Sequence, residues 1–232
     1  MTDLRPSPPM TDLRAYLEPG PCVDSAHPRV AAHARDVAGD ATDPRDVAVR
    51  LYYAVRDGVR YDPYRVETSV EGLSASRTLE QGYGFCITKA VLLAALLRAR
   101  GVPARLGYAD VRNHLTSERL RRTMGTDLFA YHGYTDVWLD GRWVKATPAF
   151  NVELCRKAGT LPLEWDGSAD SIFHPFDAGG RRHMEYVRDR GVHADVPRAE
   201  ILAAWAEIYP ADADWAGAGV QADFEAEVER AG

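Results

Sequence analysis

The sequence predicts an α+β fold, because three helical patterns precede a β-hairpin along the chain. Two amphipathic helices are expected near the start, at 29–37 and 44–58, from the spacing of their apolar and alanine residues. Residues 86–100 are apolar on nearly all sides, which is typical of a buried helix. The hairpin follows at 131–149, where two runs of aromatic and β-branched residues flank a turn. This order indicates N-terminal helices packed on an antiparallel β-sheet.

The signals next to the buried helix predict where it begins and ends. Residues 76–82 resemble a short helix with a serine cap, and Gly82-Tyr83-Gly84 follows as a glycine-rich turn. Gly101 is a natural stop for the helix that starts at Cys86. The composition of residues 102–108 is typical of a β-strand. We therefore expect Cys86 at the N-terminus of a buried helix.

The hairpin has a defined register. Asp140-Gly141 is a preferred two-residue turn, so Leu139 should pair with Arg142. The same register places His132 opposite Ala149. Trp138 shares a face with His132, where it either shapes a cleft or packs the core.

The rest of the chain predicts one domain. Residues 1–28 contain six prolines and are expected to form an irregular lead-in. Helical patches follow Asn151 at 152–158, 181–190, 198–208 and 220–230. Because no linker separates a second unit, residues 29–232 should form a single domain, with a core at about 44–151 and a C-terminal extension at 152–232.

Composition excludes several classes of function. The net charge is −6 and the basic residues form no stripe, so nucleic-acid binding is not expected. No run approaches the roughly 18 apolar residues of a membrane span, and the polar start lacks a signal peptide. The three cysteines, an odd number and widely spaced, fit a reduced cytoplasmic protein better than a disulfide framework. The sequence carries no prediction of the oligomeric state.

Two residues of the predicted core suggest thiol chemistry. The free amides and the dipole of a helix N-terminus favour a thiolate at Cys86, although a free cysteine is also commonly a small buried core residue. His132 starts the first strand of the hairpin and is the candidate general base. A cysteine on a helix end facing a histidine on a sheet is the arrangement of nucleophilic thiol catalysis.

The hairpin register also predicts which group orients the imidazole. Thr147 and Asn151 are diagonal neighbours of His132, about 7–8 Å away between α-carbons and within side-chain reach. Asp136 is on the same face but lies about 13 Å along the strand. Thr147 and Asn151, both neutral, are therefore the local candidates.

Two blocks of the sequence resemble a known family. The run 82–86, Gly-Tyr-Gly-Phe-Cys, with the apolar helix that ends before Gly101-Val102-Pro103-Ala104-Arg105, is similar to the cysteine motif of the transglutaminase-like superfamily. His132-Gly133-Tyr134 and the hairpin to Val144 resemble that family's histidine strand. Together with the preceding helices, the resemblance covers about 44–151. It implies a papain-like α+β fold with a Cys-His-Asp thiol site.

The sequence departs from this family at one position. Where the family has Asp-Pro after the hairpin, this chain has Thr147-Pro148. A neutral partner can still orient the imidazole, as asparagine does in Cys-His-Asn enzymes. We therefore expect Thr147 or Asn151 to replace the carboxylate, with Asp170 or Asp177 from the C-terminal segment as the alternative source and weakened activity as a third possibility.

Further residues are candidates for substrate binding. The backbone amide of Cys86 is the natural oxyanion donor, and Gln81 or Tyr83 could supply a second one. Trp138 and His174 are assigned to the substrate pocket. The acidic and histidine residues between 170 and 185 lack tight ligand spacing, so neither a metal nor another cofactor is predicted.

The sequence thus predicts an acyl-transfer enzyme that attacks an amide or ester through Cys86 and forms a thioester. Water as acceptor would make it a peptidase or amidase, which is the preferred reading. An amine acceptor would make it a transglutaminase or an amide-forming acyltransferase. A non-catalytic binding domain is the rival from another class, because Thr147 stands in place of the aspartate. The expected partner is a peptide, a protein or a small acyl substrate.

Overall fold

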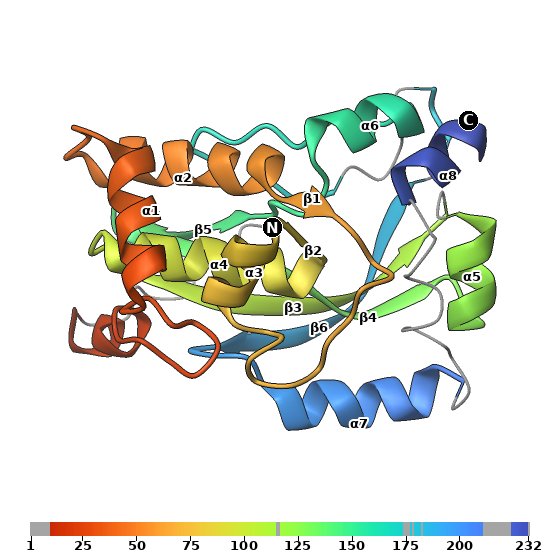
Figure 1. Cartoon of the computed structure of the whole chain (residues 1–232), viewed down its shortest axis with the longest axis horizontal. Coiled ribbons are helices and arrows are strands. Elements are labelled where there is room, and N and C mark those ends of the chain that lie inside the picture. The colour runs from red at the N-terminus through yellow and green to blue at the C-terminus, as the bar shows by residue number, and fades with distance from the viewer. Residues whose placement is uncertain are drawn as a thin grey trace.

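The computed structural model describes residues 10–114, 117–173, 177, 179–181, 183–210 and 224–231. A four-stranded antiparallel sheet forms its centre (Figure 1). The strands, in spatial order, are β5 (Arg142–Ala146), β4 (Leu128–Leu139), β3 (Ala104–Asn113) and β6 (Met184–His193). The predicted α+β class is confirmed.

One buried helix joins the sheet to the N-terminal helices. Helix α4 (Cys86–Ala99) packs on β4 and β3, and nearly all of its side chains are buried. Its other sides are covered by three helices, α1 (Pro28–Ala38), α2 (Pro44–Gly58) and α3 (Ala75–Gln81). Helix α4 has no polar face because the sheet shields one side of it from water and the three helices shield the other sides.

A short parallel pair lies beside the start of α4. Strand β1 (Arg60–Tyr61) pairs with β2 (Tyr83–Gly84), so that Tyr61 lies opposite Gly84. Helix α3 ends at Gly82 in the left-handed conformation, with φ 70°, and this reverses the chain into β2. The cap at the start of α3 is Ser74, whose hydroxyl accepts from the Arg77 amide, rather than a serine within the predicted helix at 76–82.

The predicted hairpin register is confirmed from the turn to the Thr135–Ala146 pair. Strand β5 ends at Ala146, so the predicted pair of His132 with Ala149 is not formed. Leu139 pairs with Arg142, and both turn residues have positive φ, 47° at Asp140 and 81° at Gly141. Aspartate and glycine are residue types that tolerate this conformation, so the turn chemistry alone determines the pairing.

One predicted helix is wrong. Most of residues 181–190, expected to be helical, belong to the edge strand β6. Pairing with β3 and an ion pair of 2.7 Å between Arg190 and the buried Asp110 hold this segment extended. Long-range pairing therefore overrides the weak local helical pattern.

Four further helices follow β3 along the chain. They are α5 (Glu118–Met124), α6 (Val152–Ala158), α7 (Arg198–Ile208) and α8 (Phe224–Ala231). Helix α7 packs along β4, and α6 contacts α8. Helices near 152–158 and 198–208 are thereby confirmed, as is the described part of the helix predicted at 220–230, of which residues 220–223 lie outside the described residues.

The described part of the predicted lead-in is attached to the domain. It holds a 3-10 helix, η1 (Met10–Tyr16), and the amides of Cys22 and Val23 both donate to Asp195, each at 3.1 Å. The division into a lead-in and one domain stays a prediction.

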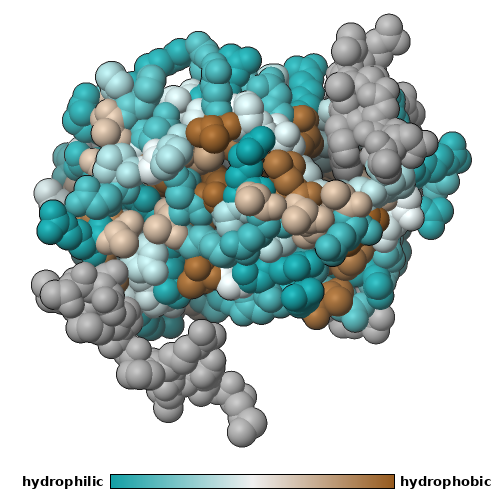
Figure 2. Space-filling view, turned by 90° about the horizontal axis from the view of Figure 1, so that it is seen from below, coloured by the Kyte–Doolittle hydropathy of each residue, from teal (hydrophilic) through white to brown (hydrophobic). Residues whose placement is uncertain are grey.

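The surface gives no sign of a membrane span. No helix among the described residues is both long and apolar enough to cross a bilayer. On the face seen in Figure 2, hydrophobic residues form small groups separated by hydrophilic ones. Scattered apolar residues of this kind are normal at a protein surface.

Candidate active site

Cys86 is the first residue of α4, as predicted. Phe85 before it is extended, and the Phe85 amide donates to the hydroxyl of Thr88 at 3.1 Å, which closes the first turn. The first amides of a helix have no partners within the helix. Here the amides of Cys86 and Ile87 are directed at the Cys86 sulfur and favour its thiolate.

Strand β4 comes very close to this first turn at Gly133. A β-carbon at Gly133 would lie 3.0 Å from the α-carbon of Ile87 and 3.3 Å from the Cys86 carbonyl oxygen. The Gly133 amide also points at the Cys86 sulfur. That amide belongs to the peptide bond between His132 and Gly133. The structure therefore brings the histidine-bearing strand against the cysteine.

The resting thiol is protonated at neutral pH. Burial raises the pKa of Cys86 to about 11, although the amides of Gly133, Ile87 and Cys86 each lower it. The side chain is only 8% exposed. Desolvation of the thiolate thus outweighs three favourable amide dipoles in the substrate-free protein.

His132 is buried more completely still. It pairs with Ala109 of β3, and its ring meets the ring of Phe173 edge-on at 5.0 Å between centroids. Burial lowers the pKa of the imidazole to about 3. Its Nε2 atom has no hydrogen-bond partner in the described part of the chain. The imidazole is therefore neutral and one of its nitrogens is unused.

The predicted hydrogen bonds from His132 to Thr147 and Asn151 are not formed. The Thr147 hydroxyl donates to the Ser171 carbonyl at 2.9 Å. The Asn151 oxygen accepts from the Tyr61 amide at 3.2 Å, and its nitrogen donates to Glu225 at 3.0 Å. Both residues are buried near the end of the hairpin, but each forms its hydrogen bonds with other segments of the chain. The hairpin register does not extend to these residues, because β5 ends at Ala146, and other segments supply their hydrogen-bond partners.

The alternative carboxylates are also engaged elsewhere. Asp170 accepts from the Lys145 amide at 2.9 Å. Asp177 pairs with Arg181 at 2.8 Å. Asp136, predicted to be too distant, pairs with Arg105 at 2.8 Å. In the described residues, no carboxylate orients His132.

The predicted substrate-binding residues lie outside the pocket at Cys86. Gln81 donates to the Tyr83 carbonyl at 2.9 Å, and the Tyr83 ring stacks with Arg65. Trp138 packs against Trp143 at 5.2 Å, near the turn of the hairpin. None of these three residues lines this pocket, and their assignment to substrate binding stays a prediction. His174 lies outside the described residues.

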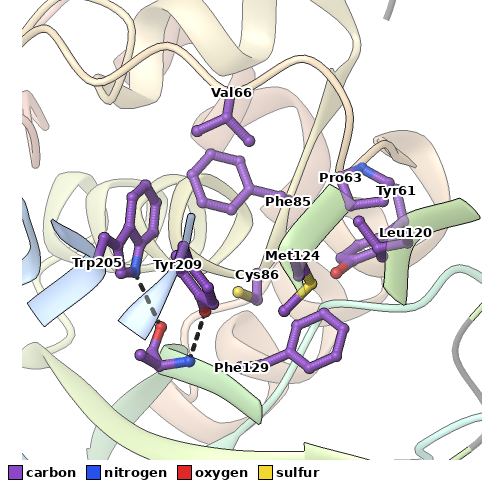
Figure 3. A pocket seen from close by; sticks show the side chains of 11 residues that line it. Tyr61, Pro63, Val66, Phe85, Cys86, Leu120, Met124, Phe129, Trp205 and Tyr209 are labelled. Atoms are coloured by element: carbon purple, nitrogen blue, oxygen red, sulfur yellow. Dashed lines mark hydrogen bonds between the residues drawn. The ribbon is translucent and has the colours of Figure 1, made fainter. Parts of the chain in front are cut away.

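A small apolar pocket of about 40 Å³ borders the thiol (Figure 3). Its walls come from β1 and the chain after it, α4, α5, β4 and α7, and they are formed by Tyr61, Pro63, Val66, Phe85, Cys86, Leu120, Met124, Phe129, Ala130, Trp205 and Tyr209. The volume exceeds the roughly 10–15 Å³ that one water requires, so a small acyl group has room.

Sequence reasoning missed two parts of this pocket. Trp205 and Tyr209 come from α7 and the residue after it, and they bind Ala130 through its carbonyl and amide at 3.2 and 2.8 Å. Tyr61 comes from β1. The pattern at 61–63 indicated only an extended segment, and 198–208 only a helix. No local signal connects either segment to Cys86.

The described residues hold no cluster of three or more potential metal ligands. The polar groups at the Cys86 pocket are backbone amides, the thiol itself, the indole of Trp205 and the phenols of Tyr61 and Tyr209. Their chemistry is that of nucleophilic attack and hydrogen bonding.

Three solved structures are similar in fold. A candidate cysteine protease from Cytophaga hutchinsonii matches with TM-score 0.48 and 17% identity over 78% of this chain and 54% of that chain. A candidate protease from Parabacteroides distasonis matches with TM-score 0.38 and 14% identity, over 59% of this chain and 25% of that chain. The periplasmic domain of TgpA from Pseudomonas aeruginosa matches with TM-score 0.43 and 21% identity, over 62% of this chain and 49% of that chain. This chain spans about half, or less, of the length of each.

No curated protein matches the sequence. A family profile does match, over residues 31–148, which is about half of the chain and includes both Cys86 and His132. This range agrees with the helices, the cysteine turn and the hairpin from which the resemblance was drawn. The chain belongs to the transglutaminase-like superfamily.

Proposed function

We propose that this protein is a cysteine-dependent acyl-transfer enzyme that hydrolyses an amide or ester through a thioester on Cys86. The observation that carries the proposal is the thiol at the start of α4, bordered by an open pocket and approached by three backbone amides. A cysteine that only packed in the hydrophobic core would require neither an adjacent pocket nor backbone amides directed at its sulfur.

The reaction begins from a neutral pair. When the substrate carbonyl binds, the Cys86 sulfur attacks its carbon and the thiol proton passes to His132. His132 then returns that proton to the leaving amine or alcohol as the thioester forms. The proposal requires an imidazole nitrogen within about 4 Å of the sulfur in the substrate complex.

Water is the preferred acceptor. The pocket is narrow and apolar, and it presents no carboxylate that would bind an amine nucleophile among its described walls. Water is present at high concentration in any case. Transfer to an amine, which would make the protein a transglutaminase or an amide-forming acyltransferase, is the alternative within the same chemistry. The natural substrate would be a peptide, a protein or a small acyl compound, and a cytoplasmic location remains part of the proposal.

A binding domain without turnover is the second candidate. The observation in its favour is the buried imidazole, whose Nε2 lacks a hydrogen-bond partner in the described residues and whose pKa is lowered to about 3. Such a ring would accept a proton only while a substrate complex stabilises the charge.

Acylation of the intact protein by p-nitrophenyl acetate separates the two candidates. An enzyme should release p-nitrophenolate and carry one acetyl group on Cys86 by intact-mass and peptide analysis. Cys86→Ala should abolish both signals. The matched control is Cys155→Ala, which removes another buried free cysteine, on α6 and away from the pocket. It should react like the unmodified protein.

Two results would overturn the proposal. One is turnover retained in Cys86→Ala. The other is a protein that remains unacetylated although circular dichroism shows it to be folded, which would favour the binding domain. Adding glycine amide to the reaction then distinguishes the acceptors, because an acyltransferase should form N-acetylglycinamide faster than acetate.

A further inference from the structure

The hydroxyl of Tyr61 is an unused hydrogen-bond donor in the pocket. The residue is 4% exposed, and Figure 3 shows its hydroxyl pointing into the pocket, toward the side where Met124 and Cys86 lie. No group of the described residues shares a hydrogen bond with it. Of the other polar side chains in the walls, Trp205 donates its indole N–H to the Ala130 carbonyl, and Tyr209 accepts from the Ala130 amide through its hydroxyl oxygen. The Tyr61 hydroxyl is therefore available to donate a hydrogen bond to a ligand in the pocket.

Several contacts hold Tyr61 rigidly beside the cysteine. Its backbone pairs with Gly84, two residues before Cys86, and the Asp62 amide donates to the Gly84 carbonyl at 2.9 Å. Asn151 accepts from the Tyr61 amide at 3.2 Å. The ring packs edge-on against Phe150 at 4.8 Å. A donor held this firmly is well suited to a reaction in which its position matters.

The phenol remains protonated across the working pH range. Burial raises the pKa of Tyr61 well above its usual value of 10, and after burial the negative charge of a Cys86 thiolate has the largest effect. The hydroxyl can donate a hydrogen bond but cannot serve as a base near neutrality.

We propose that the Tyr61 hydroxyl is a catalytic hydrogen-bond donor which, together with the Cys86 amide, stabilises the oxyanion formed at Cys86. This inference rests on the proposed function. The sulfur–carbon bond forms as the carbonyl π pair moves onto oxygen, and the thiol proton goes to His132. Tyr61 and the Cys86 amide hold the negative oxygen. The pair then returns, the carbon–oxygen bond to p-nitrophenolate breaks, and an acetyl thioester remains.

Tyr61→Phe tests this role, because it removes the hydroxyl and keeps the ring. The test compares two reactions of Cys86 in the full chain. Acylation by p-nitrophenyl acetate passes through an oxyanion, whereas alkylation by iodoacetamide displaces iodide directly and forms none. Loss of one oxyanion donor typically costs about 10²–10³ in rate. We expect that loss in kcat for acylation with KM nearly unchanged, and less than about threefold change in alkylation.

Tyr64→Phe is the matched control. Tyr64 is a fully buried tyrosine of the same segment, but its hydroxyl contacts Ser117 at 3.0 Å and does not line the pocket. It should leave the ratio of the two rates unchanged. Equal losses in both reactions of Tyr61→Phe, or no loss in acylation, would overturn the role of Tyr61 while Cys86 chemistry stands. A wild-type protein that is alkylated but never acylated would instead refute the proposed function, and this inference with it.

Discussion

Helix α4 carries two buried ionisable side chains within one turn, Cys86 and Lys89, and their surroundings differ. Lys89 is fully buried, and its ammonium donates to the carbonyls of Arg56 and Val59 at 2.9 and 2.5 Å. These carbonyls lie at the end of α2, where a helix lacks internal donors. Lys89 therefore completes the cap of α2.

Cys86 faces the opposite situation. It borders a pocket that Tyr61 also lines, and the strand that carries His132 approaches it at Gly133. The Nε2 atom of His132 has no hydrogen-bond partner among the described residues. The polar groups around Lys89 form hydrogen bonds with one another, whereas the Tyr61 hydroxyl and the His132 Nε2 atom are available to a ligand.

The comparison shows that a shifted pKa alone does not mark a catalytic group. Burial lowers the pKa of Lys89 to about 7 and raises that of Cys86 to about 11. Both shifts arise from desolvation of the charged form. Unpaired polar groups around a pocket are what separate the candidate active site from the structural one.

The largest expected effect is that of His132 on turnover. Replacing it by glutamine removes the proton acceptor for the Cys86 thiol while keeping a polar side chain of similar length. General acid–base catalysis is typically worth about 10²–10⁴ in rate, so kcat for p-nitrophenyl acetate should fall by that factor. Steady-state kinetics on His132→Gln and the parent protein measure it. A kcat within threefold of the parent value would remove His132 from the mechanism and weaken the contrast with Lys89.

The second effect is on stability in acid. The imidazole has a pKa of about 3 when folded, against a model value of 6.5, so below pH 6.5 the unfolded state binds a proton that the folded state does not. The penalty is absent above pH 6.5 and grows until pH 3. At 1.36 kcal/mol per pH unit, this single group should cost roughly 3 kcal/mol by pH 4.5.

Urea unfolding at pH 7 and pH 4.5 measures this penalty. The parent protein should lose more free energy of unfolding between the two pH values than His132→Gln does, and the difference is the contribution of the imidazole. Identical losses in the two proteins would show that His132 titrates normally and is not desolvated as described.

The smallest effect concerns Lys89. Lys89→Met keeps the length of the side chain but leaves the carbonyls of Arg56 and Val59 without their donor. An unsatisfied buried acceptor costs about 1–3 kcal/mol, so we expect a loss of about 2 kcal/mol in the free energy of unfolding. The acylation rate per folded molecule should not change.

Lys145→Met is the control for that prediction. Lys145 lies over the ring of Tyr134 at 5.1 Å on the other side of the sheet, and its loss should cost less than about 1 kcal/mol. Denaturant titrations of both variants give the comparison. Loss of acylation in folded Lys89→Met would mean that Lys89 takes part in the chemistry, and the distinction between the two sites would fail.

Local signals in the sequence determined the frame of the site. The apolar run after Cys86 predicts a buried helix, and Gly101 ends it with φ 75°. The Asp140-Gly141 turn sets the pairing of Leu139 with Arg142. These features depend on residues only a few positions apart, so periodicity and turn chemistry suffice to predict them.

Tertiary structure decided which side chains meet within that frame. The turn register predicts Asn151 on the strand face of His132, but β5 ends at Ala146 and Asn151 binds the Tyr61 amide, 90 positions away in the sequence. Residues 181–190 have a helical pattern, but pairing with β3 makes most of them a strand. Tyr61 and Tyr209 join Cys86 at one pocket only because β1 pairs with β2 and α7 packs on β4. Such contacts depend on long-range packing and on competition for hydrogen-bond partners, and neither leaves a periodic trace in the sequence.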